Sequence, residues 1–332
     1  MKQLAAALAA TVLVGACLAN DTTARVSAGG IEFLKSENIR ILQETLQISP
    51  KLITVRYRFL NESDADIRAT VAFPMPPYGW NPGHSAVDEN ERPMRSFVVK
   101  VDGKPVATRM LRRARVGSLD ITSRLRELGL SDHQIFETFG DAREDGDGLT
   151  PRQRRGVQSL AGSERAQWQV AETMLWEQLF PARRELLVEH EYVPFVGFAY
   201  SAPYQRGFGM VGRSNLVPST ARGLAKSSAE ACVQDGAQQV VDKRVRDLAA
   251  SGPEMVYLRL RDIEYVLGTG RNWRGPIGDF RLVIRKESPD QIVSLCFPGK
   301  PTRTSATTLE FNHTNFVPQD KIVVYFYDIQ SN

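Results

Sequence analysis

Alternation of apolar and polar side chains is the dominant pattern along this chain. Ile53 and every second residue up to Phe59 are apolar, whereas Thr54, Arg56 and Arg58 between them are polar. A period of two is typical of an antiparallel strand that buries one face and exposes the other. The sequence therefore predicts a half-buried strand over residues 53–59.

Turn residues divide the alternating segments from one another. Residues 61–66 are rich in Asn, Ser and Asp and predict a turn, after which residues 68–73 predict the returning strand. Residues 97–101 and 106–110 flank an Asp-Gly pair at 102–103, which predicts a hairpin. The same pattern predicts further strands over 168–175, 185–193, 256–266, 280–285 and 322–327.

Two stretches break this pattern and predict helices. In the first, about 117–165, Asp120, Asp132 and Thr150 each stand where a side chain can cap a helix, and a proline follows Thr150. The second covers about 229–250 and ends at a Ser-Gly-Pro sequence. We expect both to be helical insertions in a β framework.

The expected fold is mainly β, built from antiparallel, sandwich-like β modules. The chain has 332 residues, of which 42% are hydrophobic, so it is long and apolar enough to bury a core and is not a disordered class of protein. We interpret residues 20–200 as a first β module that carries the insertion 117–165, and residues 201–332 as a second.

The amino terminus has the pattern of a secretory signal peptide. Lys2 precedes an apolar run from Leu4 to Val14, and small residues follow up to Ala19. Cleavage after Ala19 predicts a signal over residues 1–19 and a free periplasmic protein. The residues before Cys17 also resemble a lipobox, which predicts lipidation of Cys17 and a tether to the bacterial envelope membrane. Both alternatives stay open at this point.

Export changes the interpretation of the three cysteines. Processing removes or acylates Cys17, which leaves Cys232 and Cys296 in an oxidising compartment where two thiols usually pair. We therefore predict a disulfide between them. The alternative is that one of the two is a catalytic nucleophile, although no Cys-His signature accompanies either.

The net charge of the chain does not by itself identify a class of binding partner. The chain carries 42 Lys and Arg against 38 Asp and Glu, a formal net charge of +4. Arginines gather at 109–115, at 152–155 and at 183–184, where they predict either a basic patch for anionic headgroups or a solvated face with ion pairs. Nucleic acid is disfavoured as a partner because export removes it from reach.

The segment 73–82 is the most unusual chemically, because prolines alternate with aromatic residues in it. Met75, Tyr78 and Trp80 form our candidate binding surface; the alternative is a strand exit that packs over the core edge. The sequence predicts no catalytic, cofactor-binding or metal-binding residue, since its four histidines are scattered. His190 alternates with apolar residues and is expected to face the core.

Several segments together resemble an exported bacterial family known as domain of unknown function 4424. The matching pieces are residues 19–21, 29–30, 48–74, 101–104, 125–130, 180–181, 189–194, 265–270, 272–277 and 279–282. The resemblance implies an exported β protein and supports the pairing of Cys232 with Cys296. It implies no activity, and it provides no catalytic residue or cofactor.

We therefore expect an exported cell-envelope protein that is non-enzymatic and binds an envelope ligand or protein through loops on a rigid scaffold. The alternative is a periplasmic hydrolase that acts on envelope glycan or peptide with carboxylates the sequence does not identify. A third hypothesis is a stress-related structural factor with no small ligand.

Overall fold

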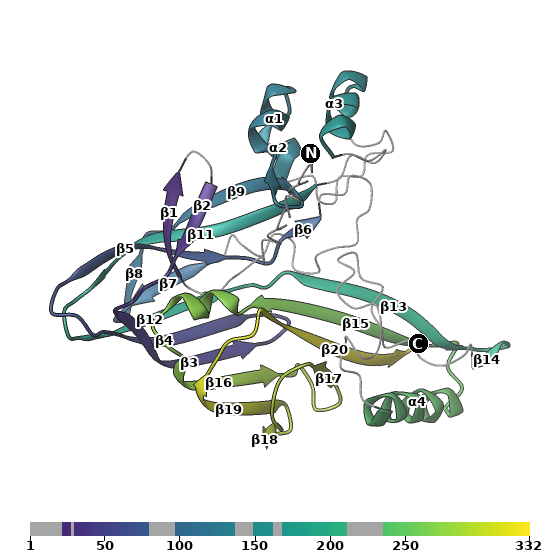
Figure 1. Cartoon of the computed structure of the whole chain (residues 1–332). Coiled ribbons are helices and arrows are strands. Elements are labelled where there is room, and N and C mark those ends of the chain that lie inside the picture. The colour runs from purple at the N-terminus through teal and green to yellow at the C-terminus, as the bar shows by residue number, and fades with distance from the viewer. Residues whose placement is uncertain (1–21, 28–29, 80–96, 137–148, 162–167, 211–234) are drawn as a thin grey trace, which may run out of the picture.

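The computed structural model describes residues 22–27, 30–79, 97–136, 149–161, 168–210 and 235–332 (Figure 1). It is mainly β, with three sheets and a few helices inserted between strands. The predicted fold class is therefore confirmed.

The largest sheet has eight strands, and all but one of its neighbouring pairs are antiparallel. The exception is β16 beside β3, which run parallel from Asp279 opposite Gln43 to Ile284 opposite Ile48. In order, the strands are β18 (Thr302–Ser305), β19 (Thr308–Phe316), β16 (Ile277–Arg285), β3 (Ile39–Ile48), β4 (Ile53–Asn61), β12 (Glu185–Tyr192), β7 (Val98–Val101) and β8 (Lys104–Val106).

The other two sheets are antiparallel throughout. The seven-stranded sheet contains β10 (Leu119–Asp120), β9 (Arg109–Val116), β11 (Gln169–Phe180), β5 (Ile67–Pro74), β1 (Thr22–Ser27) and β2 (Gly30–Leu34), with β6 (Tyr78–Gly79) paired to β11. The five-stranded sheet contains β14 (Gly209–Met210), β13 (Val196–Gln205), β15 (Met255–Val266), β20 (Lys321–Ser331) and β17 (Ile292–Leu295).

One hydrophobic core joins the three sheets. Val71 of the seven-stranded sheet, Tyr57 of the eight-stranded sheet and Tyr265 of the five-stranded sheet all belong to it. The two tyrosine hydroxyl oxygens lie 3.4 Å apart, so the sheets meet at a polar contact inside an apolar layer. Trp273 is 1% exposed and packs 4.8 Å from the ring of Phe59, which makes it an anchor of this core.

The alternation that predicted β4 is confirmed in the structure, since Tyr57 and Phe59 are buried whereas Arg56 and Arg58 are exposed. The expectation that residues 68–73 return beside this strand is wrong. β5 pairs with β11 and β1 in a different sheet, and β12 lies beside β4 instead. Turn residues show that the chain reverses, but the strand's partner depends on distant backbone groups.

The polar turn before β5 is held by its own side chains and by a second loop. The Asn61 side chain donates to the carbonyl of Ala65 over 2.8 Å. Asp66 accepts the backbone N–H of Ala182 over 2.8 Å, and Asp64 accepts from the Arg183 guanidinium at the same distance. That guanidinium lowers the pKa of Asp64 through its hydrogen bond and its charge. The two aspartates therefore fasten two turns together.

The predicted hairpin over 97–110 is confirmed only for its first part. β7 and β8 pair across Asp102 and Gly103, whose φ angles of 46° and 76° suit the left-handed turn that an Asp-Gly pair favours. The chain then leaves this sheet, because β9 pairs with β11 of the seven-stranded sheet. The predicted second strand therefore spans two sheets.

The first predicted insertion contains α1 (Thr122–Glu127), α2 (Asp132–Phe136) and α3 (Pro151–Ala161). They lie over β9 and β11 (Figure 1) and bury a small core of their own. Inside it, the indole of Trp168 donates to the carbonyl of Ile135 over 3.0 Å. The insertion is thus a folded layer with its own apolar contacts.

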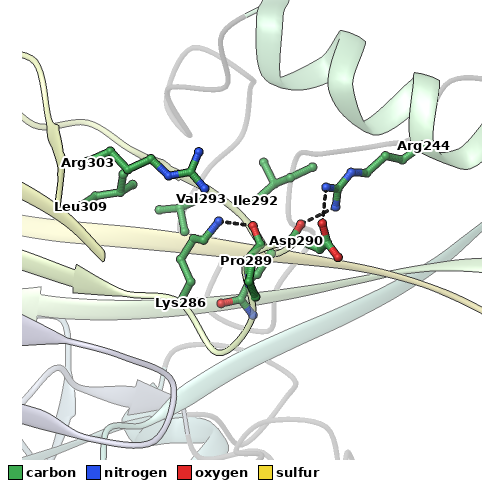
Figure 2. A pocket seen from close by; sticks show the side chains of 9 residues that line it. Arg244, Lys286, Pro289, Asp290, Ile292, Val293, Arg303 and Leu309 are labelled. Atoms are coloured by element: carbon green, nitrogen blue, oxygen red, sulfur yellow. Dashed lines mark hydrogen bonds and ion pairs between the residues drawn. The ribbon is translucent and has the colours of Figure 1, made fainter. Parts of the chain in front are cut away.

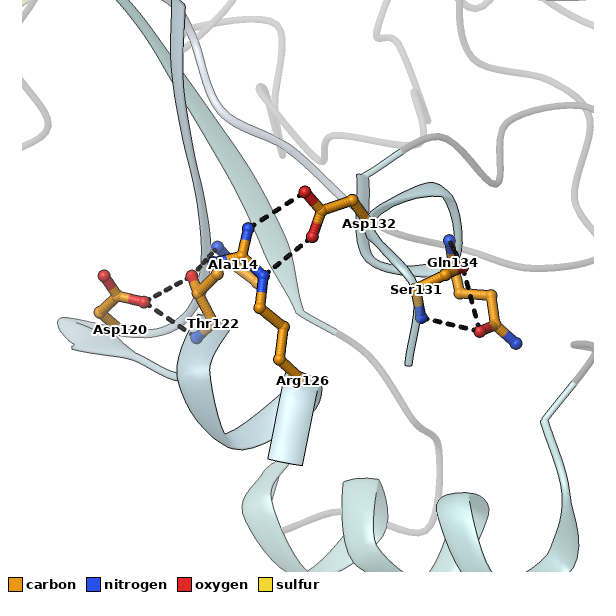
Figure 3. Close-up of polar contacts among 7 residues, drawn as sticks. All are labelled: Ala114, Asp120, Thr122, Arg126, Ser131, Asp132 and Gln134. Carbon is orange, nitrogen blue, oxygen red and sulfur yellow. Dashed lines mark hydrogen bonds and ion pairs between the residues drawn. The ribbon is translucent and has the colours of Figure 1, made fainter. Parts of the chain in front are cut away.

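Side chains cap these helices, though not always the predicted ones (Figure 3). Asp120 precedes the N-cap position, Ile121, and accepts the backbone N–H of Thr122 over 2.9 Å, so the predicted residue binds the first N–H of α1 from one position further out. For α2 the cap is Ser131 rather than Asp132, since the hydroxyl of Ser131 accepts the N–H of Gln134. Asp132 binds the Arg126 guanidinium instead. The cap of α2 is therefore the hydroxyl of the residue before the helix, and the adjacent carboxylate forms an ion pair instead.

The second predicted insertion contains α4 (Asp235–Ala250), which covers one face of the five-stranded sheet. Val241 and Val245 are fully buried against Leu258 and Leu260 of β15. The helix is followed by Gly252, whose φ of 82° suits a residue without a side chain. This face is therefore a second small core beside the main one.

The predicted boundary between residues 200 and 201 stays a prediction. Strands from both sides of it share one sheet, since β16 lies beside β3. In the described part of the chain, no helix combines the length and apolar content needed to cross a membrane.

Candidate functional site

A cationic cleft lies where α4, the loop 286–291 and the β18–β19 hairpin meet (Figure 2). We call it the cleft. Its volume is about 430 Å³, and it is lined by Arg244, Lys286, Pro289, Asp290, Gln291, Ile292, Val293, Arg303 and Leu309. Three of these side chains are cations and one is a carboxylate, so the charged lining has an excess of two positive charges.

The loop that forms one wall is fixed by hydrogen bonds at both ends. Its first residue, Lys286, donates its backbone N–H to the carbonyl of Thr307 in the β18–β19 turn over 2.8 Å. The Lys286 ammonium reaches back to the carbonyl of Pro289 over 2.5 Å. The loop then enters β17, which pairs with β20. Lys286 is therefore held between two elements of regular structure.

Arg244 connects α4 to the same loop. Its guanidinium donates to the backbone carbonyl of Asp290 over 2.5 Å and to the Asp290 carboxylate over 2.7 Å. A two-pronged contact of this kind suits the planar, forked guanidinium. Arg244 thus both shapes the cleft wall and adds positive charge to it.

The charges in the cleft affect the pKa of Lys286. Burial lowers the pKa of its ammonium below the usual lysine value, and the charges of Arg303 and Arg244 lower it further, whereas the Asp290 carboxylate opposes them. The part of this shift that comes from the two guanidinium charges means that the protonated ammonium is repelled by its neighbours in the cleft. An anion placed among these groups would relieve that repulsion.

Donor groups remain available for such an anion. Arg303 donates from Nε to the carbonyl of Ser305 and from Nη2 to that of Ala306, over 3.2 and 3.1 Å. Its Nη1 makes no further hydrogen bond among the described residues, and the Lys286 ammonium uses one of its three protons on Pro289. In Figure 2 the Arg303 guanidinium points toward the Lys286 ammonium.

A network of charges centred on the buried Arg261 stands behind the cleft floor. Gln291 lines the cleft yet is 2% exposed, and its amide donates to the Asp328 carboxylate over 2.9 Å. Asp328 also accepts from Arg261, which is 5% exposed and bonds Glu287 as well. Lys51 adds a second cation to Glu287 at 3.3 Å. The floor is therefore rigid and tied to two central strands.

The lining of the cleft is poor in carboxyl groups. Its single carboxylate, Asp290, is committed to Arg244, so it does not provide the pair of carboxyl groups that glycoside hydrolysis uses. Across the described residues, no group of three or more His, Cys, Asp or Glu side chains could hold a metal ion.

The candidate surface predicted from the sequence lies elsewhere. Met75 is 6% exposed and belongs to the main core, so it contributes no surface. Tyr78 is half-buried, stacks on Phe195 at 5.9 Å and donates to the Glu172 carboxylate over 3.1 Å. Trp80 lies outside the described residues. For Met75 and Tyr78 the strand-exit alternative describes the observed packing.

The cysteine predictions fall largely outside the described residues. Cys17 and Cys232 are both outside, and Cys296 directly follows β17. The disulfide between Cys232 and Cys296, and the lipidation of Cys17, stay predictions. His190 is 3% exposed and lies among aromatic rings, with that of Phe73 at 4.7 Å, so its expected place in the core is confirmed.

The arginines at 109–115 lie on β9, and two of them form ion pairs. Arg112 lies 3.1 Å from the Glu172 carboxylate, and Arg113 lies 2.9 Å from that of Asp120. This part of the basic sequence is thus a face with paired charges.

The three cations of the cleft were not found from the sequence. They are distributed over positions 244, 286 and 303, where each is one ordinary basic residue among many. The only local signal is the polar Lys-Glu-Ser-Pro-Asp run at 286–290 between two apolar strands, which indicates a turn and nothing more. The folded sheets alone bring these residues together.

Comparisons with known proteins give a family and one distant structural likeness. A family model described as Domain of unknown function (DUF4424) matches residues 19–325. Among solved structures, the chain is similar to a presumed nutrient-binding protein of Legionella pneumophila, with 13% sequence identity and a TM-score of 0.42, over 93% of this chain and 70% of that one. No curated protein matches the chain. At this identity and TM-score, no property of the Legionella protein is transferred.

Proposed function

The chain belongs to the DUF4424 family, and from that premise we propose that it is a non-enzymatic cell-envelope protein that binds a ligand in the cleft. The observation that carries the proposal is the convergence of three cations, Arg244, Lys286 and Arg303, on one open cleft with a single carboxylate. Unbalanced charge in a preformed concave site favours the binding of an opposite charge.

The construction of the cleft supports recognition by a fixed surface. Its residues come from α4, from the loop after β16 and from the β18–β19 hairpin, all of which rest on the sheets. The buried Arg261 and its partly exposed partner Asp328 support the floor through Gln291. A site built on supported elements needs little reordering when a ligand binds, which favours affinity.

The envelope location is part of the proposal and rests on the predicted signal over residues 1–19. It is tested by the intact mass of the protein produced with its leader in a bacterial host. An unmodified chain that begins at Asn20 indicates the free periplasmic form, and an acylated chain that begins at Cys17 indicates the membrane-tethered form. A chain that retains Met1 in the cytoplasmic fraction contradicts export. A deficit of two hydrogens supports the disulfide between Cys232 and Cys296.

The binding proposal is tested by thermal unfolding with a panel of small anions and neutral sugars. We expect at least one anion to raise the Tm of the wild-type protein, because a ligand that binds only the folded state stabilises it. The double variant Lys286→Gln/Arg303→Gln should lose that rise. The control Lys100→Gln, an exposed lysine on β7 in another part of the eight-stranded sheet, should keep it. No response to any anion, or an equal response in the double variant, contradicts the proposal.

A further inference from the structure

The cleft has features that select among anions, and we infer that it takes a phosphate group held between Lys286 and Arg303. The phosphate would belong to a small phosphomonoester or to a lipid headgroup. This inference rests on the proposed binding function and adds the chemical class of the ligand.

Charge balance is the first argument. Arg244, Lys286 and Arg303 carry three positive charges, and Asp290 carries one negative charge, which leaves two positive charges uncompensated in the lining. A phosphomonoester carries about −1.5 to −2 charges at neutral pH. A single carboxylate or a sulfate ester carries one negative charge and would leave part of the excess. A metal cation or a neutral sugar would leave all of it.

The position of the donors is the second argument. Lys286 and Arg303 line the same cleft, and in Figure 2 the Arg303 guanidinium points toward the Lys286 ammonium. Arg303 offers its Nη1 group, and Lys286 offers the protons not used on Pro289. Compact, three-oxygen anions make several charge-assisted hydrogen bonds to such donors at once. A dicarboxylate would spread the same charge over two separated groups.

Apolar residues in the lining indicate that the phosphate carries an organic group. The lining also includes Ile292, Val293 and Leu309. All three side chains are partly buried. Free inorganic phosphate would leave this apolar surface in contact with water, whereas the carbon chain of a phosphomonoester would cover it. We therefore expect an organic phosphate to bind more tightly than inorganic phosphate.

A substitution at Asp290 should increase the affinity for phosphate, whereas structural damage to the cleft would decrease it. Its carboxylate is the only negative group of the lining, and it binds Arg244 through both its side chain and its backbone carbonyl. The variant Asp290→Asn removes the repulsion of an incoming phosphate but keeps the backbone contact to Arg244. We expect this variant to bind phosphate more tightly than the wild-type protein.

The test uses titration calorimetry of the whole mature protein in low-salt buffer without phosphate. The probes are glycerol 3-phosphate, inorganic phosphate and succinate, and a separate arm uses phosphatidylcholine vesicles with and without phosphatidic acid. We expect glycerol 3-phosphate to bind, with a loss of affinity of about tenfold or more in Lys286→Gln and in Arg303→Gln, because each removes a charge-assisted contact. Lys100→Gln should bind as the wild-type protein does, and Asp290→Asn should bind more tightly.

The binding results distinguish the phosphate inference from the proposed binding function. Binding of the vesicles but not of glycerol 3-phosphate, with the same variant effects, supports the inference with a lipid as the source. Binding of glycerol 3-phosphate alone supports a soluble phosphomonoester. If succinate binds in the cleft and no phosphate does, the inference is overturned while the proposed binding function stands. If no probe in either this experiment or the thermal panel responds to the cleft variants, both fail.

Discussion

The guanidinium of Arg261 donates to the carboxylate of Asp328 over 2.7 Å, between the neighbouring central strands β15 and β20. Arg261 is 5% exposed and also binds Glu287, at the beginning of the loop that forms one wall of the cleft. One buried cation thus satisfies two carboxylates and joins the five-stranded sheet to the cleft. Removing it would leave two partly exposed carboxylates near each other without the cation that they share.

We expect Arg261→Met to lower the free energy of unfolding by about 3 kcal/mol, near the lower end for a broken buried pair, because both carboxylates are partly exposed. The matched control is Arg281→Met, which removes an exposed guanidinium from Glu310 on the eight-stranded sheet. That change should cost about 1 kcal/mol or less. Urea unfolding of the three proteins measures both. Equal losses in the two variants would show that the network around Arg261 stabilises the fold no more than an exposed ion pair does.

The ion pairs of Glu287 in this network predict how the free energy of unfolding changes at acidic pH. Burial raises the pKa of Glu287, but hydrogen bonds and charges from Arg261 and Lys51 outweigh it, so that the pKa lies below the ordinary value of 4.5. A carboxyl group with a lowered folded-state pKa stabilises the fold above its unfolded pKa and loses this effect as pH falls through the folded value.

We therefore expect the wild-type protein to be more stable than Glu287→Gln at neutral pH, with a difference that is constant down to about pH 4.5 and shrinks below it. Urea midpoints of the two proteins across the acidic range measure this difference. A gap that widens on acidification would contradict the assignment.

A third prediction concerns the titration of Lys286. Burial, Arg303 and Arg244 lower its pKa, in that order, whereas Asp290 raises it. Arg303→Gln should therefore move the pKa of Lys286 up toward the ordinary lysine value, and Asp290→Asn should move it further down. Carbon-13 spectra of the reductively methylated protein follow each lysine, with Lys100 as the internal reference. Shifts of the same sign in both variants would rule out charge coupling within the cleft.

The sign for stability follows from the same direction. A base with a lowered folded-state pKa binds its proton less readily in the folded than in the unfolded state. The contribution of Lys286 to stability therefore rises with pH as its folded form loses the proton, and it is least favourable at low pH. In Lys286→Gln, the free energy of unfolding should therefore rise less between neutral and alkaline pH than it does in the wild-type protein. Urea midpoints at several pH values measure this difference.

A fourth prediction tests the single parallel strand pair. A side chain at Gly278 of β16 would place its Cβ 2.4 Å from the backbone oxygen of Leu42, the residue at the irregularity in β3. The backbone of a central strand moves only at a cost, so we expect Gly278→Ala to destabilise the protein by about 2 kcal/mol. Gly79→Ala, where nothing lies within 4 Å of the new atom, is the control and should be nearly neutral. Unfolding midpoints compare them.

Much of the fold was predictable because it depends on neighbouring residues. The alternation over 53–59, the turn residues at 61–66 and the cap at Thr150 each gave the correct local element. The exchange of Asp132 for Ser131 as the cap of α2 moved the start of one helix by a single position. Such features are decided by side-chain direction and by hydrogen bonds that span a few residues.

The partners of those elements were not predictable in the same way. β5 follows β4 after a short turn yet pairs with β11 about a hundred positions later, and β3 lies parallel to β16 near the other end of the chain. Backbone hydrogen bonds are the same for every residue, so they do not identify the strand that will supply them. Only the joint burial of all apolar faces selects one arrangement.

The sequence by itself determined that this is a β protein, where its helical insertions and many of its strands lie, and which faces of those strands are apolar. It did not identify other strands, among them β3 and β13. The tertiary structure decided which strands share a sheet and, through them, that Arg244, Lys286 and Arg303 converge. The physical reason is the range of the interactions. Hydrophobic periodicity is set along the chain, whereas Coulomb interactions depend on distance in space, so the cleft exists only once the sheets have brought its three cations together.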